Sequence, residues 1–224
     1  MIPGTATLPD RLRTRICKRA FSSPEALLYE ASIAPGVTAI VEAAIADDVT
    51  GPFVLDVGCG GGRLARALRG SARVVIGIDP SWSQVRRTVK RAGVAIRASS
   101  DGLPFREATF NTVVASCSLK HWNDQAAGLQ ECARVVRPGG RVVIVEIDGG
   151  STTAEVTTFA ARTRIPHPLR RSYVEFAMRT VVGVAPTRDQ LEGLVRRSQL
   201  EIRTIRRLEG LPFIVVVTEL PPSI

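Results

Sequence analysis

The chain has 224 residues, of which 45% are apolar and 23% are charged. This balance excludes a collagen-like or disordered chain, and the length suits one globular domain. Thirty basic against 21 acidic residues give a net charge of +9, which suits anionic partners and equally an ordinary solvated surface. No apolar run is long enough to span a membrane and the N-terminus lacks the apolar core of a secretory signal, so we expect a cytoplasmic protein.

The four cysteines lack the spacing of a metal site or a disulfide framework. Cys17, Cys59, Cys117 and Cys132 form no C-x-x-C pair. We therefore expect reduced thiols and no bound metal.

Two kinds of pattern follow one another along the first two thirds of the chain. Residues 1–50 carry helical patterns, interrupted at Pro35-Gly36, and are expected to form an N-terminal helical cap. From Phe53 onward, short β-branched runs alternate with amphipathic segments, which is typical of a parallel sheet covered by helices on both faces. The predicted strands are residues 53–57, 73–79, 94–98, 110–117 and 140–147. The predicted helices are residues 62–70, 81–93 and 123–136.

The last third breaks this alternation. Residues 149–198 contain two helical patterns separated by "RIPHPLRR". A third helix is predicted to begin at a capping box of Thr187 and Gln190. We expect these residues to form a helical insertion over the substrate. Residues 199–224 predict an antiparallel hairpin. The predicted fold class is α/β, a Rossmann-like, doubly wound and mostly parallel seven-stranded sheet. We expect a single domain in which residues 51–148 are the cofactor-binding core.

A glycine-rich turn follows the first predicted strand in "VLDVGCGGG", residues 54–62. Ligands of open α/β sheets bind at the carboxyl ends of strands, and glycines let a ligand approach the backbone closely. The dinucleotide pattern G-x-G-x-x-G fails because Arg63 occupies the third glycine position, and no Gly-Lys-Ser/Thr follows. Asp56 would also repel a phosphate beside it. The turn therefore predicts a cationic ligand.

This stretch resembles the first motif of class I S-adenosylmethionine-dependent methyltransferases, an acidic residue and a spacer followed by G-x-G-x-G. The order of later motifs, "GIDPS", "SSDGLPF" and "RVVRPGGRVVIVE", is similar to the small-molecule, type 11-like branch of that family. The resemblance implies S-adenosyl-L-methionine as cofactor and S-adenosyl-L-homocysteine as product. It implies that Asp56 holds the methionine end and Asp79 the ribose hydroxyls. An isolated Asp more often caps a helix or starts a turn, but three acids at successive strand ends favour a shared ligand. The expected cofactor-binding residues are Asp56, Gly58, Cys59, Gly60, Asp79, Pro80, Asp101, Gly102, Leu103 and Ser116.

The loop after the fourth strand, "SCSLKHWND", is expected beside the transferred methyl group. Its His121 is one of two histidines in the chain, and we predict it as a general base toward a substrate hydroxyl, with packing of the loop as the alternative role. The loop lacks the Asn/Asp-Pro-Pro-Tyr/Phe motif of methyltransferases that act on nucleic-acid bases. We predict further substrate contacts from Tyr29, Trp122, Arg170 and Tyr173.

The predicted function is methyl transfer to a small-molecule acceptor, with a hydroxyl oxygen as the acceptor atom. Arginines of the insertion suit an anionic acceptor, although an exposed helical face explains them equally well. RNA methylation is the alternative enzymatic function, which the low aromatic content of 5% disfavours, and a non-catalytic cofactor-binding protein is the third. The acceptor and the oligomeric state are not determined by the sequence.

Overall fold

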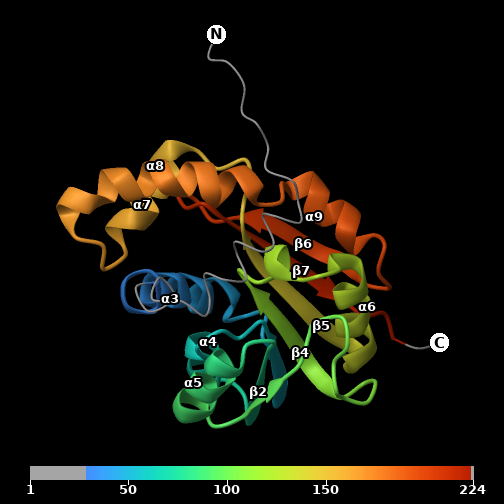
Figure 1. Ribbon diagram of the computed structural model, residues 1–224. Helices are drawn as coiled ribbons and strands as arrows, with labels where there is room; N and C mark the ends of the chain where they lie inside the picture. The colour runs from blue at the N-terminus through green and yellow to red at the C-terminus, as the bar shows by residue number, and fades with distance from the viewer. Residues whose placement is uncertain (1–28, 223–224) are drawn as a thin grey trace.

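The computed structural model describes residues 29–222, so the predictions for residues 1–28, including Cys17, lie outside the described part. One seven-stranded sheet runs through it in the order β3-β2-β1-β4-β5-β7-β6 (Figure 1). The strands are β1 (Phe53–Val57), β2 (Val74–Asp79), β3 (Ala95–Arg97), β4 (Phe110–Ser116), β5 (Val136–Ile147), β6 (Glu201–Arg207) and β7 (Phe213–Glu219). The first five pair in parallel and β7 is antiparallel to both β5 and β6. The predicted mostly parallel sheet with a C-terminal antiparallel hairpin is confirmed.

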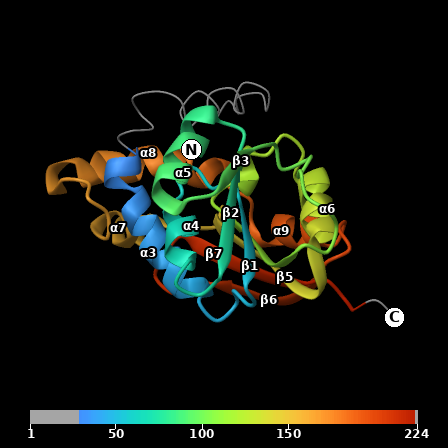
Figure 2. The ribbon, with the colours of Figure 1, turned by 90° about the horizontal axis from the view of Figure 1, so that it is seen from below.

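Helices cover both faces of the sheet. Successive residues of a strand point to opposite faces, so each buried strand contributes side chains to two cores. In β1, Val54 packs into a core with α3 (Ala34–Ile45) and α4 (Arg63–Leu68), whereas Leu55 packs into a second core with α6 (Gln125–Val135) and α9 (Arg188–Val195). Figure 2 shows α3, α4 and α5 (Trp82–Ala92) on one face and α6 and α9 on the other.

Local signals set the ends of several helices. Asp124 accepts a hydrogen bond from the Ala127 N–H at the start of α6, and the predicted capping box of Thr187 and Gln190 begins α9. Ile33 forms the turn before α3, and Pro35 lies in the first turn of that helix, where its missing N–H costs nothing. The interruption expected at Pro35-Gly36 lies two residues earlier, at Ile33, because a proline is tolerated in the first turn of a helix, and Pro35 and Gly36 are themselves helical residues of α3.

The insertion after β5 contains α7 (Thr153–Ala161), a short 3-10 turn η2 (His167–Leu169), α8 (Arg170–Thr180) and a second turn η3 (Val182–Val184). Figure 1 shows α7 and α8 projecting beyond the edge of the sheet. Among residues 29–222, no helix has the length and apolar character needed to cross a membrane.

The strand expected over residues 140–147 begins earlier, at Val136. Val136 pairs with Phe110, and pairing then shifts until Arg141 lies opposite Thr112. The residues between them form an irregular stretch in which Gly139 adopts a φ of 74°. Pro138, Gly139 and Gly140 thus form an irregularity within β5, because β-pairing with β4 is present on both sides of them.

Candidate functional site

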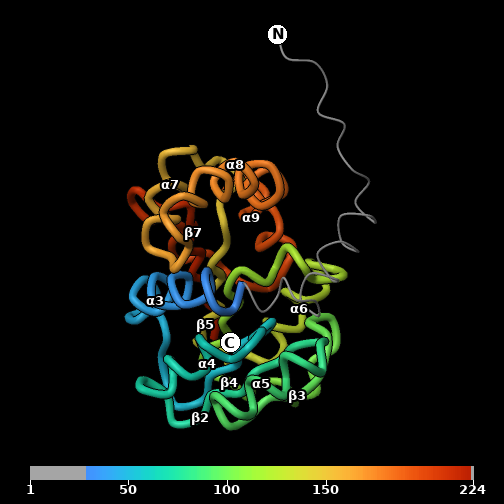
Figure 3. The backbone as a smooth tube through the Cα atoms, turned by 60° about the vertical axis from the view of Figure 1, so that its left-hand side comes forward, coloured from blue at the N-terminus to red at the C-terminus, as the bar shows by residue number. Residues whose placement is uncertain are grey.

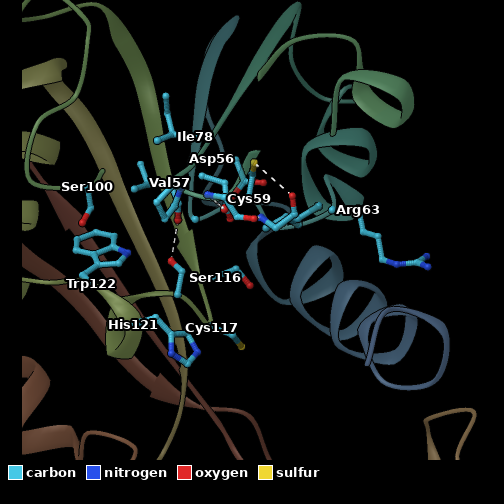
Figure 4. Close-up of a pocket in the computed structure, with 18 of the residues that line it drawn as sticks. Asp56, Val57, Cys59, Arg63, Ile78, Ser100, Ser116, Cys117, His121 and Trp122 are labelled. Atoms are coloured by element: carbon cyan, nitrogen blue, oxygen red, sulfur yellow. Dashed lines mark hydrogen bonds between the residues drawn. The ribbon is translucent and has the colours of Figure 1, made fainter. Parts of the chain in front are cut away.

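A cavity of about 490 Å³ lies at the carboxyl ends of β1, β2 and β4. Its wall combines the glycine turn after β1, the end of β2, the segment 98–100 and the loop 116–123 (Figure 4). The helical residues 29–30 and part of α3 complete it. The fold therefore collects in one place segments that are far apart in the sequence.

The glycine turn is fixed by hydrogen bonds to the neighbouring strand. The N–H groups of Gly58 and Cys59 both donate to the Ile78 carbonyl, at 2.8 and 2.9 Å. Gly58 has a φ of 77°, and a Cβ atom there would lie 2.4 Å from the Cβ of Ser118. Ser118 in turn donates to the Val57 carbonyl at 2.7 Å. The turn after β1 and the loop after β4 therefore approach each other too closely for any side chain at position 58.

Gly60 differs from Gly58, because no described residue occupies the space where its side chain would lie. It lines the cavity with a φ of 51°, and a Cβ atom there would meet no described atom within 4 Å. The space above it is therefore open to a ligand that approaches the backbone.

Asp56 lies in this cavity with only 1% of its surface exposed. Among the described residues its Oδ2 atom has no hydrogen-bond partner. Burial, and secondly the nearby charge of Asp79, raise the pKa of Asp56 to about 7. A buried carboxylate with an unused acceptor atom is costly alone and is stabilised by a cation. Its chemistry fits an ammonium group and disfavours a phosphate.

Asp79 ends β2 and its carboxylate holds two backbone groups. Oδ2 accepts from the Gly60 N–H at 3.1 Å, and Oδ1 accepts from the Ser81 N–H at 2.8 Å. Burial raises the pKa of Asp79, while these two bonds lower it. Each carboxylate oxygen has two acceptor sites, so both still have capacity for hydroxyl donors.

The residues predicted at the adenine lie differently. Asp101 and Gly102 are exposed, and Leu103 is buried with its N–H donating to Glu131 at 2.8 Å. None of the three lines the cavity, whereas Ser99 and Ser100 do. Contact of residues 101–103 with a cofactor stays a prediction. The other predicted cofactor-binding residues all line the cavity, namely Asp56, Gly58, Cys59, Gly60, Asp79, Pro80 and Ser116.

His121 and Trp122 also line the cavity, on the short 3-10 helix η1 (Leu119–His121) and just after it. Burial and the adjacent Lys120 ammonium lower the pKa of His121 to about 3, so the imidazole is neutral at physiological pH. The Trp122 ring packs so closely against Gly128 that a Cβ atom there would lie 2.4 Å from it. The Trp122 Nε1 atom is buried and has no hydrogen-bond partner among residues 29–222.

A buried ion pair holds this loop in place. Glu146, fully buried near the end of β5, accepts from the Leu119 N–H at 2.7 Å and from the Lys120 Nζ at 3.1 Å. Lys120 also donates to the Cys117 carbonyl at 3.2 Å. Because Glu146 binds the two residues before His121, the position of the imidazole depends on β5.

Of the three remaining predicted substrate residues, one lines the cavity and two do not. Tyr29 lines the cavity, and burial together with the nearby Cys117 and Tyr173 raises its pKa. Burial and Cys117 raise the pKa of Tyr173 to about 12, and both residues pack against the same hydrophobic core, although Tyr173 is not part of the cavity wall. Arg170 donates to the Ile165 carbonyl at 3.1 Å and also lies outside the wall.

Sequence reasoning did not identify the contacts that close the cavity from the N-terminal side. Glu30 accepts from the Arg63 Nε at 3.2 Å and from an Arg91 terminal nitrogen at 3.2 Å, joining the start of the described chain to α4 and α5. Cys117, also missed, lines the cavity with a φ of 50°, which is unusual for a side-chain-bearing residue. No local pattern marks Glu30, since its two partners lie 33 and 61 positions away.

The sheet order and the acidic, glycine-lined cavity define a Rossmann-like protein whose site suits a cationic cofactor. Residues 55–144 match the family model described as methyltransferase domain. This part of the chain is therefore similar to class I S-adenosylmethionine-dependent methyltransferases of the small-molecule type. The cofactor of this family has an ammonium and a sulfonium group and no phosphate, which agrees with the buried Asp56 and the open space above Gly60.

Curated relatives match the same part of the chain. A demethylmenaquinone methyltransferase from Corynebacterium kroppenstedtii is 31% identical over 139 residues, covering 62% of this chain and 55% of the relative. A ubiquinone biosynthesis O-methyltransferase from Rhizobium johnstonii is 32% identical over 114 residues, covering 48% and 46%. The O-methyltransferase resE from Aspergillus sclerotiorum is 37% identical over 106 residues, covering 43% and 40%. The chain thus spans about half the length of these relatives.

Solved structures extend the similarity of fold to nearly the whole chain. A SAM-dependent methyltransferase, possible histamine N-methyltransferase, from Thermotoga maritima is similar with a TM-score of 0.63 and 17% identity, covering 94% of this chain and 96% of that one. The cyclase SpnF has a TM-score of 0.62 and 15% identity, with 82% of each chain covered. At these identities the comparison shows the fold alone.

The open space above Gly60 predicts the effect of adding one methyl group there. Gly60→Ala should destabilise the protein by only about 1 to 2 kcal/mol, the cost of a left-handed Ala, yet weaken S-adenosylmethionine binding more than tenfold, measured by titration calorimetry. Gly210→Ala is the matched control, because Gly210 has a φ of 66°, no described neighbour within 4 Å of its Cβ position and no place in the cavity wall. Equal cofactor affinity in both variants would show that no ligand lies against Gly60.

The raised pKa of Asp56 predicts that cofactor affinity depends on pH. The carboxylate form attracts the ammonium group, and Asp56, with a pKa of about 7, is mostly protonated at pH 5.5. Affinity should therefore rise roughly tenfold or more between pH 5.5 and 7.0, a range that lies below the α-amino pKa of about 7.7 to 8.0. Asp56→Asn should bind more weakly, with a flat profile over this range. A wild-type profile equally flat would remove Asp56 from contact with the cation.

Proposed function

We propose that this protein transfers the methyl group of S-adenosylmethionine to a hydroxyl oxygen of a small-molecule acceptor. The observation that carries the proposal is that two buried carboxylates, an open glycine turn and a neutral imidazole all line one cavity. A carboxylate and a glycine turn suit the cofactor, and an imidazole beside them suits an acceptor that loses a proton. The names of the relatives add support, since ubiquinone biosynthesis O-methyltransferase and resE are both O-methyltransferases.

Each part of the wall has a distinct role in this proposal. Asp56 would hold the ammonium group and Asp79 the ribose hydroxyls, while Gly60 lets the cofactor approach the backbone. When bound, the cofactor supplies an activated methyl group and its own leaving group. The protein then has to align the acceptor, exclude water and accept a proton.

The acceptor side belongs to the loop after β4. The buried Trp122 Nε1 would donate to an acceptor oxygen, while the Trp122 ring, fixed against Gly128, provides a flat apolar wall. His121 would take the hydroxyl proton as the new bond forms. Its pKa of about 3 keeps the imidazole unprotonated through the physiological range, and an acceptor that becomes anionic beside it strengthens it as a base.

The test has two parts, binding and turnover. Titration with S-adenosylmethionine and S-adenosylhomocysteine should show that both bind. A screen of phenolic, quinol, sugar and fatty-acid acceptors, scored by mass increase of the acceptor, should find methylation of a hydroxyl group. Binding without any methylated acceptor would favour a non-catalytic cofactor-binding protein, and methylation of RNA alone would replace the small-molecule assignment.

His121→Ala should lower kcat roughly a hundredfold or more, because a positioned proton acceptor contributes about 10²- to 10⁴-fold. The cofactor dissociation constant should change little, since the cofactor is assigned to Asp56 and Asp79. The wild-type rate should also show no acid limb from His121 between pH 5 and 8, because burial and Lys120 lower its pKa far below that window. A variant with near-normal turnover at every pH would reduce His121 to a packing role.

A further inference from the structure

The outer surface of α5 and the edge strand β3 is both apolar and cationic. Six large apolar side chains are exposed among the described residues, and four of them lie here. They are Trp82, Val89, Val94 and Ile96, exposed by 55%, 45%, 46% and 37%. Together with the exposed Arg86, Lys90 and Arg97, we call them the α5–β3 surface.

Helical spacing explains why these side chains share one side of α5. Val85, Thr88 and Ala92 form its buried face. Trp82 and Val89 are seven positions apart, so they lie on the same flank two turns from each other. Arg86 and Lys90 follow on the adjacent exposed stripe. The Arg86 guanidinium lies 5.8 Å from the centre of the Trp82 ring, so charge and apolar surface are interleaved.

The charge of this segment has one sign. Residues 82–100 contain four arginines and one lysine but no acidic residue. Only Arg91 of the five has a described carboxylate partner, Glu30. The second place with exposed apolar side chains is α8 with the preceding turn, where Leu169 and Phe176 are exposed. There, Arg171 is paired with Glu175 on the same helix. The two surfaces lie on opposite sides of α3 (Figures 1 and 3).

We propose that the α5–β3 surface docks on an anionic phospholipid membrane. Exposed Trp and aliphatic side chains gain free energy at the boundary of headgroups and acyl chains, and cations beside them bind the lipid phosphates. A second copy of the chain is disfavoured, because a two-fold contact through this surface would oppose Arg86 and Lys90 to their own copies. RNA would satisfy the cations but leave Val89, Val94 and Ile96 in water.

The α5–β3 surface lies next to the cavity wall, so docking would place the cavity near the membrane. Pro80 and Ser81 line the cavity, and Trp82 is the next residue, so the docked edge adjoins the cavity wall. A membrane beside that wall would bring lipid-dissolved molecules close to the cavity. The docking itself does not depend on the proposed methyl transfer.

Vesicle binding tests this proposal directly. The chain has two tryptophans, so a Trp122→Phe background leaves Trp82 as the single reporter of its own environment. With vesicles of equal phosphatidylglycerol and phosphatidylcholine at 0.1 M salt, Trp82 emission should shift to the blue and the protein should co-sediment. Pure phosphatidylcholine should bind far less.

Paired charge reversals locate the contact. Arg86→Glu with Lys90→Glu should lower the vesicle partition coefficient roughly 25-fold or more, since each cation near an anionic surface contributes about fivefold. Arg171→Glu with Arg179→Glu on α8 is the matched control and should change it little. Circular dichroism and cofactor affinity verify that both variants fold. Any one of three results would overturn the proposal. These are no binding to the anionic vesicles, loss of binding only in the α8 variant, or binding of single-stranded RNA but not of vesicles.

Discussion

A carboxylate buried at the end of β1 is the constraint on which the rest of this site depends. Asp56 is taken out of water with one oxygen lacking a partner among residues 29–222, and a second acid, Asp79, lines the same cavity. Asp56 loses its hydration and is also repelled by Asp79, which together raise the pKa of Asp56 to about 7. An arrangement that opposes folding in this way is stabilised when a cation binds. Binding of a cation in this cavity would therefore be thermodynamically linked to folding.

The parallel sheet is what brings the two acids together. The Asp56 Cα lies opposite Gly77 of β2, and Asp79 follows two residues later at the end of that strand. The Gly58 and Cys59 N–H groups bond to Ile78, between these positions, so the glycine turn is held against β2. The Gly60 N–H then bonds to Asp79 itself. Asp79, which lines the cavity, thus also fixes the conformation of the glycine turn.

Patterns in the sequence predicted the features that depend on residues close together in the chain. The capping box at Thr187 and the alternation of residues 53–57 depend on near neighbours, and the structure confirms both. The extension of β5 to Val136 was missed because it depends on Phe110 of another strand. The Trp122 contact with Gly128 and the Glu30 contacts with α4 and α5 are likewise set by tertiary packing. Spacing along the chain placed the acids at strand ends but did not show that residues 99–100, rather than 101–103, line the cavity.

The loop after β4 shows the same principle in a further buried charge. Glu146 has no exposed surface, and its pairing with Lys120 is an inefficient source of stability, because desolvation of both charges offsets their attraction. The main effect of Glu146 is to position the loop after β4. One carboxylate binds the Leu119 N–H and the Lys120 ammonium, so the residues before His121 are attached to the end of β5 at two points. The Lys120 charge also helps keep the imidazole neutral. Asp56 on β1 and Glu146 on β5 are thus buried carboxylates on two strands of one sheet, and the sheet fixes the position of the loop that carries His121 relative to Asp56.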